Sequence, residues 1–398
     1  MDRLKACVYG QTIVQTQGHN MKKLFYIIII LSLPCVIYAA PNPTGTSGIW
    51  SHGETVQITC EDSSFGAKSP AAPVIWDDCE SGSITDLWTK PLPDSATGSY
   101  DMAYRTETFR TVDAPHGAGD NSRFAGGGHD PAGYDPYNGA AGPNVGLWTT
   151  DVSGYSKIYI SCYTTLDPSF PWSPNNIKNM ETGSGSPPYG GSQAYWPYSC
   201  FNSGVGWAEW GSNCDMGYLC QQMDEHPEIW AIGDYVKVWH KREFITQDGS
   251  FCDIYLNNVI KWDTGSCDPI SFTPAYFGIG GYYRKTAAED GDPDAWRYYD
   301  DIYVDTTFSR VMLGNASTYS SCTVLEPQPP TAWSTSSITV TVNEGKLHDD
   351  PGAGESVYVY VFNANNEHNT NGLEVTLGEG GSTPTITGIS VSGGVGIN

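Results

Sequence analysis

Short segments of alternating apolar and polar residues recur along this chain of 398 residues, separated by glycine, proline, asparagine or aspartate. Alternation with a period of two indicates β-strands that bury one face. The turn Asn257-Asn258 between two such segments predicts a β-hairpin. We therefore expect an all-β protein built from packed antiparallel sheets. The expected strands are 157–162, 235–246, 253–262, 275–283, 298–305, 336–342 and 355–362.

The amino-acid composition supports an all-β protein and excludes several other classes of protein. The chain contains 45 Gly and 26 Pro, scattered without a repeat, which excludes collagen, and its 13 Trp, 25 Tyr and 12 Phe exclude a disordered polyanion. The formal net charge is -24, and no window carries a Lys/Arg stripe. Nucleic acid is therefore excluded as a partner, and anionic membranes are disfavoured.

The N-terminal region has the pattern of an export signal. An apolar run at 24–38 follows Met21-Lys22-Lys23 and precedes Ala39-Ala40, the order of a secretory signal peptide. We expect residues 1–39 to be an upstream extension and signal peptide, with either Met1 or Met21 as the start. The run is too short to span a membrane comfortably. The sequence predicts a secreted or cell-surface protein without membrane insertion after signal cleavage.

Nine cysteines remain after the predicted cleavage site. In an oxidising compartment they are expected to form disulfides rather than a metal site, and no CxxC pair is present. Spacing does not determine their connectivity, and the odd number leaves one thiol over. The first pairings to test are Cys252 with Cys267, and two of the group Cys200, Cys214 and Cys220.

Two segments far apart in the chain together resemble an IPT/TIG immunoglobulin-like domain. The first contains Gly-Glu-Thr-Val-Gln-Ile-Thr at 53–59, then Ser64-Phe65-Gly66 and Pro73-Val74-Ile75-Trp76. The second contains Trp333-Ser334 with the strand that follows, and Val357-Tyr358-Val359-Tyr360-Val361-Phe362. The resemblance implies one small sandwich, 40–75 plus 327–378, split by a large insertion. The alternative is two separate small β units. Residues 379–398 form a Gly/Ser/Thr-rich tail, a linker or an edge strand.

The inserted region, 76–326, resembles a concanavalin A-like jelly roll of the laminin G, glucanase and lyase type. Its beginning, Trp76-Asp77-Asp78-Cys79-Glu80-Ser81-Gly82 with Trp88, and its end at 298–305 are similar to the adjacent terminal strands of that fold. Trp239 to Phe244, Asp248-Gly249, Tyr255-Leu256-Asn257-Asn258 and 277–282 are similar to its core strands and hairpin. This likeness implies an antiparallel jelly-roll sandwich, and it bears on fold more than on activity.

An aromatic-rich stretch at 167–220 is the main candidate for carbohydrate binding. It is rich in Gly, Ser and Pro and shows no strand pattern, so we expect a loop over the sheet. Aromatic rings stack against sugar faces, and exposed rings in a loop indicate a binding role. The alternative is a lid that covers the sheet. The rings are Trp172, Tyr189, Tyr195, Trp196, Tyr198, Trp207 and Trp210.

An acidic loop offers a candidate cation site. Asp290, Asp292 and Asp294 alternate in the sequence Glu-Asp-Gly-Asp-Pro-Asp, as calcium coordination by a short loop requires. The downstream bidentate glutamate of an EF-hand is absent. Calcium is therefore one prediction for this loop, and a solvated acidic turn is the other.

A catalytic site is expected only if the protein is a polysaccharide lyase. The segments Tyr104 to Arg110 and Tyr276 to Tyr282 resemble strands of alginate-lyase-like proteins. That resemblance implies Arg105 neutralising a uronate and Tyr282 moving protons, with His240 as the partner histidine. The sequence departs from the family pattern: an extra residue precedes Arg110, Gly278 replaces a lysine, and no Gln-x-His triplet occurs. The paired carboxylates of laminarinase-type glycosidases are also absent.

The sequence therefore favours a non-enzymatic protein that binds polysaccharide or surface glycans, or mediates adhesion. The second hypothesis is a polysaccharide lyase or glycoside hydrolase on the same fold. The third is a structural subunit of an extracellular assembly that associates with itself through exposed edge strands.

Overall fold

Antiparallel β-sheets dominate the computed structural model, and the prediction of an all-β protein is confirmed. Every pair of named strands is antiparallel, and two short 3-10 turns, η3 (Tyr319–Ser321) and η4 (Gly345–His348), occur among the described residues. The structure describes residues 40–79, 87–88, 90–91, 106–108, 121–125, 147–166, 175–185, 193–202, 206–210, 229–230, 239–247, 249–262, 272–279, 283–285 and 297–378.

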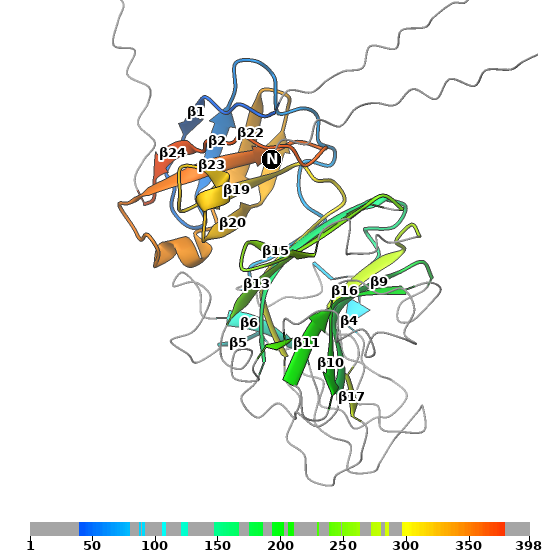
Figure 1. Ribbon diagram of the computed structural model, residues 1–398. Coiled ribbons are helices and arrows are strands. Elements are labelled where there is room, and N and C mark those ends of the chain that lie inside the picture. Colours follow the sequence, from blue (N-terminus) through cyan, green and yellow to red (C-terminus); the bar gives the residue numbers. More distant parts are fainter. Residues whose placement is uncertain are drawn as a thin grey trace, which may run out of the picture. The chain divides into compact units, whose positions relative to one another are not determined.

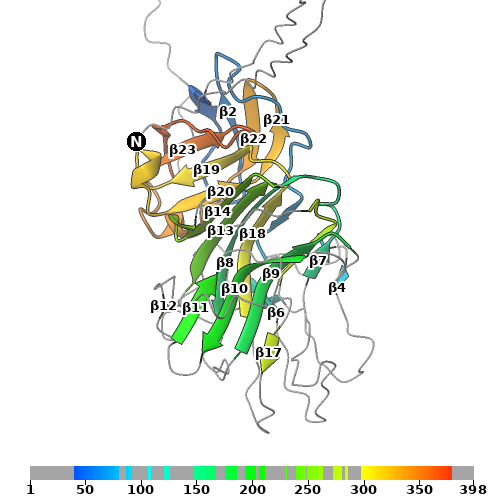
Figure 2. The same cartoon turned by 45° about the vertical axis from the view of Figure 1, so that its right-hand side comes forward.

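The larger sandwich has two eight-stranded sheets (Figures 1 and 2). The first, called the β8 sheet, runs β15 (Val259–Trp262), β14 (Phe251–Leu256), β13 (His240–Gln247), β8 (Lys157–Leu166), β18 (Arg297–Asp305), β6 (Asn121–Ala125) and β5 (Thr106–Thr108), with β3 (Ile75–Asp77) beside β18. The second, called the β9 sheet, runs β12 (Ile229–Trp230), β11 (Gly206–Trp210), β10 (Gln193–Asn202), β9 (Asn175–Gly183), β16 (Tyr276–Ile279), β7 (Leu147–Thr149) and β4 (Lys90–Pro91), with β17 (Tyr283–Lys285) beside β9.

The core of this sandwich lies between its two sheets. Ile160, Phe244 and Val304 from the β8 sheet belong to one buried cluster with Met180 and Phe277 from the β9 sheet. On β8 the alternate residues Ile158, Ile160 and Cys162 belong to the cluster, as expected when one face of a sheet is buried. The opposite face of each sheet does not contribute to this core.

The β14–β15 hairpin confirms the turn predicted from sequence. Asn257 and Asn258 have φ angles of 48° and 63°, and the two strands pair on either side of them. Two consecutive positive φ angles suit the right-handed twist of a hairpin, and asparagine tolerates this conformation better than most residues. The sequence alone predicted this hairpin because the two paired strands are adjacent in the chain.

The smaller sandwich combines strands from both ends of the described chain. One sheet runs β1 (Gly45–Ser47), β2 (Thr55–Thr59), β22 (Ser337–Thr341) and β21 (Pro330–Trp333). The other runs β20 (Leu325–Gln328), β19 (Arg310–Gly314), β23 (Ser356–Phe362) and β24 (Leu373–Thr376). In Figure 1 the blue strand β2 lies beside the orange strand β22, and the register pairs Val56 with Val340 and Ile58 with Ile338. Both pairs are buried in one core.

The strand pairing modifies the boundaries expected from sequence. Strands β19 and β20 pair in the smaller sandwich, although the sequence placed residues up to 326 in the larger one. The larger sandwich begins at β3 and ends at β18, and these two strands are paired, with Ile302 opposite Asp77. Membership of the IPT/TIG family stays a prediction.

The expectation of a loop at 167–220 is wrong for much of that stretch. Strands β9, β10 and β11 occupy consecutive positions in the β9 sheet. Tyrosine and tryptophan favour strands, but aromatic and polar residues occur here at both odd and even positions. The alternation that identifies a half-buried strand is therefore hidden.

Candidate functional site

The outer face of the β9 sheet carries two large aromatic rings on β7 and β16. Leu147 and Phe277 point into the core cluster, whereas Trp148 and Tyr276 are absent from it. The alternation of side chains along a strand places Trp148 and Tyr276 on the other face of the sheet. Their rings meet edge to face, with centroids 5.3 Å apart and planes 69° apart.

Glycines opposite these rings allow them to lie close to the sheet. Gly278 pairs with Trp148, and Gly183 pairs with Tyr276. A Cβ atom at Gly278 would lie 2.2 Å from Cε3 of Trp148, and one at Gly183 would lie 2.5 Å from the Tyr276 hydroxyl. Aromatic rings that cover glycines on a neighbouring strand compensate for the missing side chains. The sequence alone does not identify Trp148, because no local pattern links it to a glycine 130 positions away.

The register aligns four positions into one row across this face. Trp148 on β7 pairs with Gly278 on β16, Gly278 pairs with Glu181 on β9, and Glu181 pairs with Tyr195 on β10. Directly opposite positions share a face of a sheet. The outer row is defined here as Trp148, Gly278, Glu181 and Tyr195. It combines two aromatic positions, one carboxylate position and a glycine that the Trp148 indole covers.

The predicted carbohydrate-binding residues are divided between the two faces by this register. Trp196 pairs with the core residue Met180, so its backbone position is on the core face. Tyr198 and Trp210 pair with each other and share the parity of Trp196, whereas Tyr195 and Trp207 have the opposite parity. Trp172 and Tyr189 lie outside the described residues.

Trp148 and Tyr276 are themselves enclosed. Their exposed fractions are 1% and 0%. These rings therefore fill the β7–β16 end of the face and shape it, and they do not form an open stacking platform. Within the outer row, a ligand would therefore have to contact the positions on β9 and β10.

Only one of the three lyase candidates lies in the described part of the structure. His240 lies on β13 in the β8 sheet, where it is buried, and its Nδ1 is 3.1 Å from Nδ2 of Asn257. Arg105 and Tyr282 lie outside the described residues. The lyase assignment stays a prediction.

The remaining predicted sites are only partly covered by the structure. Asp290, Asp292 and Asp294 lie outside the described residues, and within those residues no group of three His, Cys, Asp or Glu side chains could hold a metal. Cys252 is disulfide-bonded, but Cys267, Cys214 and Cys220 lie outside the described residues, so the pairings stay predictions. Cys200 lies on β10. No helix among the described residues is long and apolar enough to cross a membrane.

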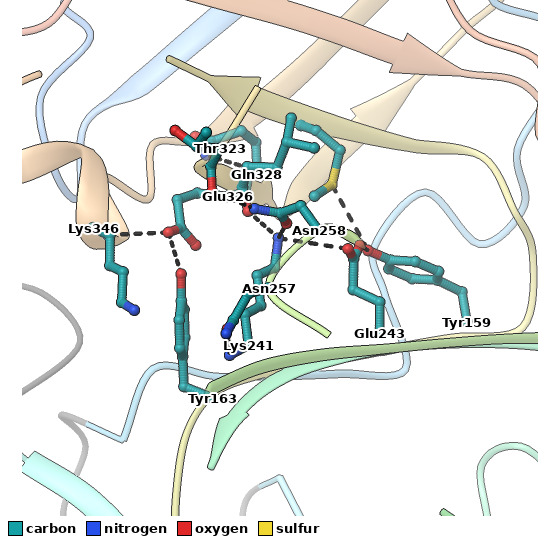
Figure 3. Close-up of polar contacts among 12 residues, drawn as sticks. Tyr159, Tyr163, Lys241, Glu243, Asn257, Asn258, Thr323, Glu326, Gln328 and Lys346 are labelled. Atoms are coloured by element: carbon teal, nitrogen blue, oxygen red, sulfur yellow. Dashed lines mark hydrogen bonds and ion pairs between the residues drawn. The ribbon is translucent and has the colours of Figure 1, made fainter. Parts of the chain in front are cut away.

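A second cluster of polar residues lies between the β8 sheet and the smaller sandwich (Figure 3). The Tyr163 hydroxyl on β8 donates to Oε1 of Glu326 on β20, and the backbone N–H of Lys346 on η4 donates to the same oxygen at 3.1 Å. The Lys241 ammonium on β13 donates to the carbonyl of Leu325. Tyr163, Lys241 and Glu326 are all buried. We call the cluster of Tyr163, Lys241, Glu326 and Lys346 the joint.

A second group of contacts extends the joint. The Tyr159 hydroxyl donates to Oε1 of Glu243 at 2.6 Å, and Nζ of Lys241 lies 3.9 Å from Oε2 of Glu243. Nδ2 of Asn258, in the predicted hairpin turn, donates to the carbonyl of Thr323 at 2.8 Å. The Arg310 guanidinium lies between two rings, 4.3 Å from that of Tyr159 and 3.6 Å from that of Phe362.

Burial changes the acidity of several groups in the joint. Desolvation raises the pKa of Glu326 to about 7, and nearby Asp301 acts in the same direction, while Lys241 and the hydrogen bonds from Tyr163 and Lys346 oppose the shift. Desolvation also raises the pKa of Tyr159 and of Tyr163. The Glu326 carboxyl is fully buried, so it does not line an open reaction site.

No family model matches the sequence, and no curated protein matches it. Among solved structures, the chain is similar to a cellulose-induced protein, Cip1, with 16% identity, a TM-score of 0.36, and coverage of 58% of this chain and 97% of that one. It is also similar to the alginate lyase Aly36B, with 9% identity, a TM-score of 0.32, and coverage of 46% and 80%.

A third similar structure is a Trypanosoma rangeli sialidase, with 12% identity, a TM-score of 0.25, and coverage of 42% of this chain and 25% of that one. Similarities this low do not transfer an activity or a ligand. The all-β assignment rests instead on the strand pairing of the chain itself.

Proposed function

We propose that this protein is exported and binds an extended glycan on the outer face of the β9 sheet. The observation that carries the proposal is the outer row, in which the register aligns a carboxylate position, Glu181, with an aromatic position, Tyr195. Carboxylates accept hydrogen bonds from sugar hydroxyls, and aromatic rings stack on sugar faces. The position of Trp207, on the same face, extends this surface along β11.

The charge of the protein narrows the class of glycan. A formal net charge of -24 repels polyuronates and sulfated chains at low ionic strength. A carboxylate position in the row adds to this repulsion locally. The proposed ligand is therefore a neutral polysaccharide or a neutral surface glycan.

The test is retention on a panel of immobilised polysaccharides, with released products assayed in the same samples. We expect Tyr195→Ala and Glu181→Gln each to weaken retention on a neutral glycan about tenfold, since each removes one stacking or hydrogen-bonding contact. Tyr155→Ala is the matched control, because Tyr155 is 40% exposed in the turn before β8. Circular dichroism confirms that each variant is folded.

Three outcomes decide between this function and the other hypotheses. Unchanged retention in both outer-row variants would overturn the proposal. Unsaturated products or new reducing ends would support the lyase or glycosidase instead. Concentration-dependent filaments without glycan retention would support a structural subunit that assembles through its edge strands.

A further inference from the structure

The surface between the two sandwiches is polar and charged, which is unusual for a contact so deeply buried. Within the described residues, Lys241, Glu243, Arg310 and Glu326 all contribute to it, and each is no more than 4% exposed. Charged groups are rarely buried unless they are paired, because leaving water is costly. The stability of this contact must therefore depend on the protonation of its members.

The Glu326 carboxyl is only partly compensated by hydrogen bonds. Its Oε1 accepts hydrogen bonds from Tyr163 and from the backbone of Lys346, but its Oε2 has no hydrogen-bond partner among the described residues. An ionised carboxylate would leave charge on an oxygen that no group in this part of the chain bonds. A neutral carboxyl group at the same place costs less.

Charged and titratable groups from four elements surround Glu326. They are Tyr163 from β8, Lys241 from β13, Asp301 from β18 and Lys346 from η4. Lys241 gives its hydrogen bonds to Leu325 and Asn258, and lies 3.9 Å from Glu243. Nζ of Lys346 lies 5.0 Å above the Tyr163 ring and 3.4 Å from the Trp239 carbonyl. Neither ammonium is hydrogen-bonded to the Glu326 carboxylate.

We propose that the joint is a proton-controlled contact, in which neutral Glu326 holds the two sandwiches together and its ionisation loosens them. This device is independent of glycan binding. It makes the attachment of the larger sandwich to the smaller one tighter in mildly acidic surroundings than in alkaline ones.

The sign of the pH dependence follows from linkage. In the closed joint the pKa of Glu326 is raised to about 7 from an ordinary 4.5, chiefly by desolvation. A raised pKa means that the closed state binds the proton more tightly than the open state. Its stabilisation is complete below the ordinary pKa and is lost as the pH rises through about 7. Between about pH 5.5 and about pH 8, the opening equilibrium should increase roughly thirtyfold.

The test is hydrogen exchange measured by mass spectrometry on the full chain at these two pH values. The probes are peptides that contain η4, where the Lys346 N–H is bonded to Glu326, and β13. A peptide from β22, in the same smaller sandwich, corrects for the intrinsic pH dependence of exchange. We expect protection of the probe peptides, relative to β22, to fall roughly thirtyfold from acid to alkaline pH.

Two variants separate the role of Glu326 from general stability. Glu326→Gln keeps the shape but cannot ionise, so the relative protection should become independent of pH. Tyr163→Phe removes a hydrogen bond that favours the ionised form and should move the midpoint of the change to higher pH. Glu374→Gln, at a carboxylate on β24 that bonds the Ser356 hydroxyl, is the matched control and should behave as the unmodified protein.

The proposal is overturned if the thirtyfold change persists in Glu326→Gln, or if the unmodified protein shows none. Should Glu326→Gln fail to fold, the Tyr163→Phe midpoint decides: an unchanged midpoint overturns the proposal. Glycan retention measured on the same samples reports separately on the proposed function.

Discussion

At the scale of single residues, close approaches between rings and backbone determine which substitutions the β9 sheet tolerates. Gly278 is on a regular strand, so its backbone angles do not require glycine. What requires glycine there is the Trp148 indole on the neighbouring strand, which occupies the space a side chain would need. The constraint therefore comes from a tertiary contact.

Gly278→Ala should destabilise the protein by about 1–3 kcal/mol, because the methyl group would displace the buried indole. Chemical denaturation monitored by tryptophan fluorescence measures the loss. The cost should shrink when the substitution is made in a Trp148→Leu background, as a double-mutant cycle would show. Equal costs in both backgrounds would show that the indole is not the obstacle.

At the scale of elements, the smaller sandwich depends on the pairing of β2 with β22. These strands are far apart in the sequence, yet five consecutive residue pairs join them. Alternate residues of β2 are buried, with Val56 and Ile58 in the core and Gln57 exposed between them. The two segments of chain that resemble halves of one domain are therefore held together by one hydrophobic face.

Ile58→Ala should cost about 2–5 kcal/mol, because it removes buried methyl groups and leaves a cavity beside Ile338. Gln57→Ala, one residue away on the exposed face, should change the free energy of unfolding by less than about 0.5 kcal/mol. Thermal or chemical unfolding measures both values. Similar effects at the two positions would contradict the assigned register.

At the scale of the whole molecule, the chain passes between the two sandwiches twice, and one ion pair links the two crossings. Lys68 lies in the segment between β2 and β3, and Asp305 ends β18 just before β19. Their charged atoms are 2.9 Å apart, and both side chains are buried. Nζ of Lys68 also donates to the Ala71 carbonyl at 2.6 Å. The Lys68–Asp305 ion pair and the joint therefore connect the two sandwiches at separate places.

Lys68→Met should destabilise the protein by about 3–5 kcal/mol, because it leaves the Asp305 carboxylate buried without its partner. Lys157→Met is the control, since Lys157 is only partly buried and donates one hydrogen bond to the Ala364 carbonyl. Its loss should be about 1 kcal/mol or less. Adding Asp305→Asn to Lys68→Met should recover part of the stability, and the absence of any recovery would argue against the ion pair as the cause.

The sequence by itself determined the features that depend on neighbours in the chain. Alternation predicted β8, β13, β18, β22 and β23, and Asn257-Asn258 predicted the hairpin. These succeeded because a period of two and a positive φ are local properties. Strands β9, β10 and β11 could not be predicted in this way, since their residues favour strands without alternating in polarity.

Only the tertiary structure decided which residues share a site. The outer row brings together positions 148, 181, 195 and 278 from four strands. The joint brings together Tyr163, Lys241, Glu326 and Lys346 from four elements. A shift of one residue in any pairing would exchange the two faces of a strand, so register controls both sites. Register is set by the packing of whole sheets, which is why the face of Trp196 and the environment of Glu326 emerged only from the folded chain.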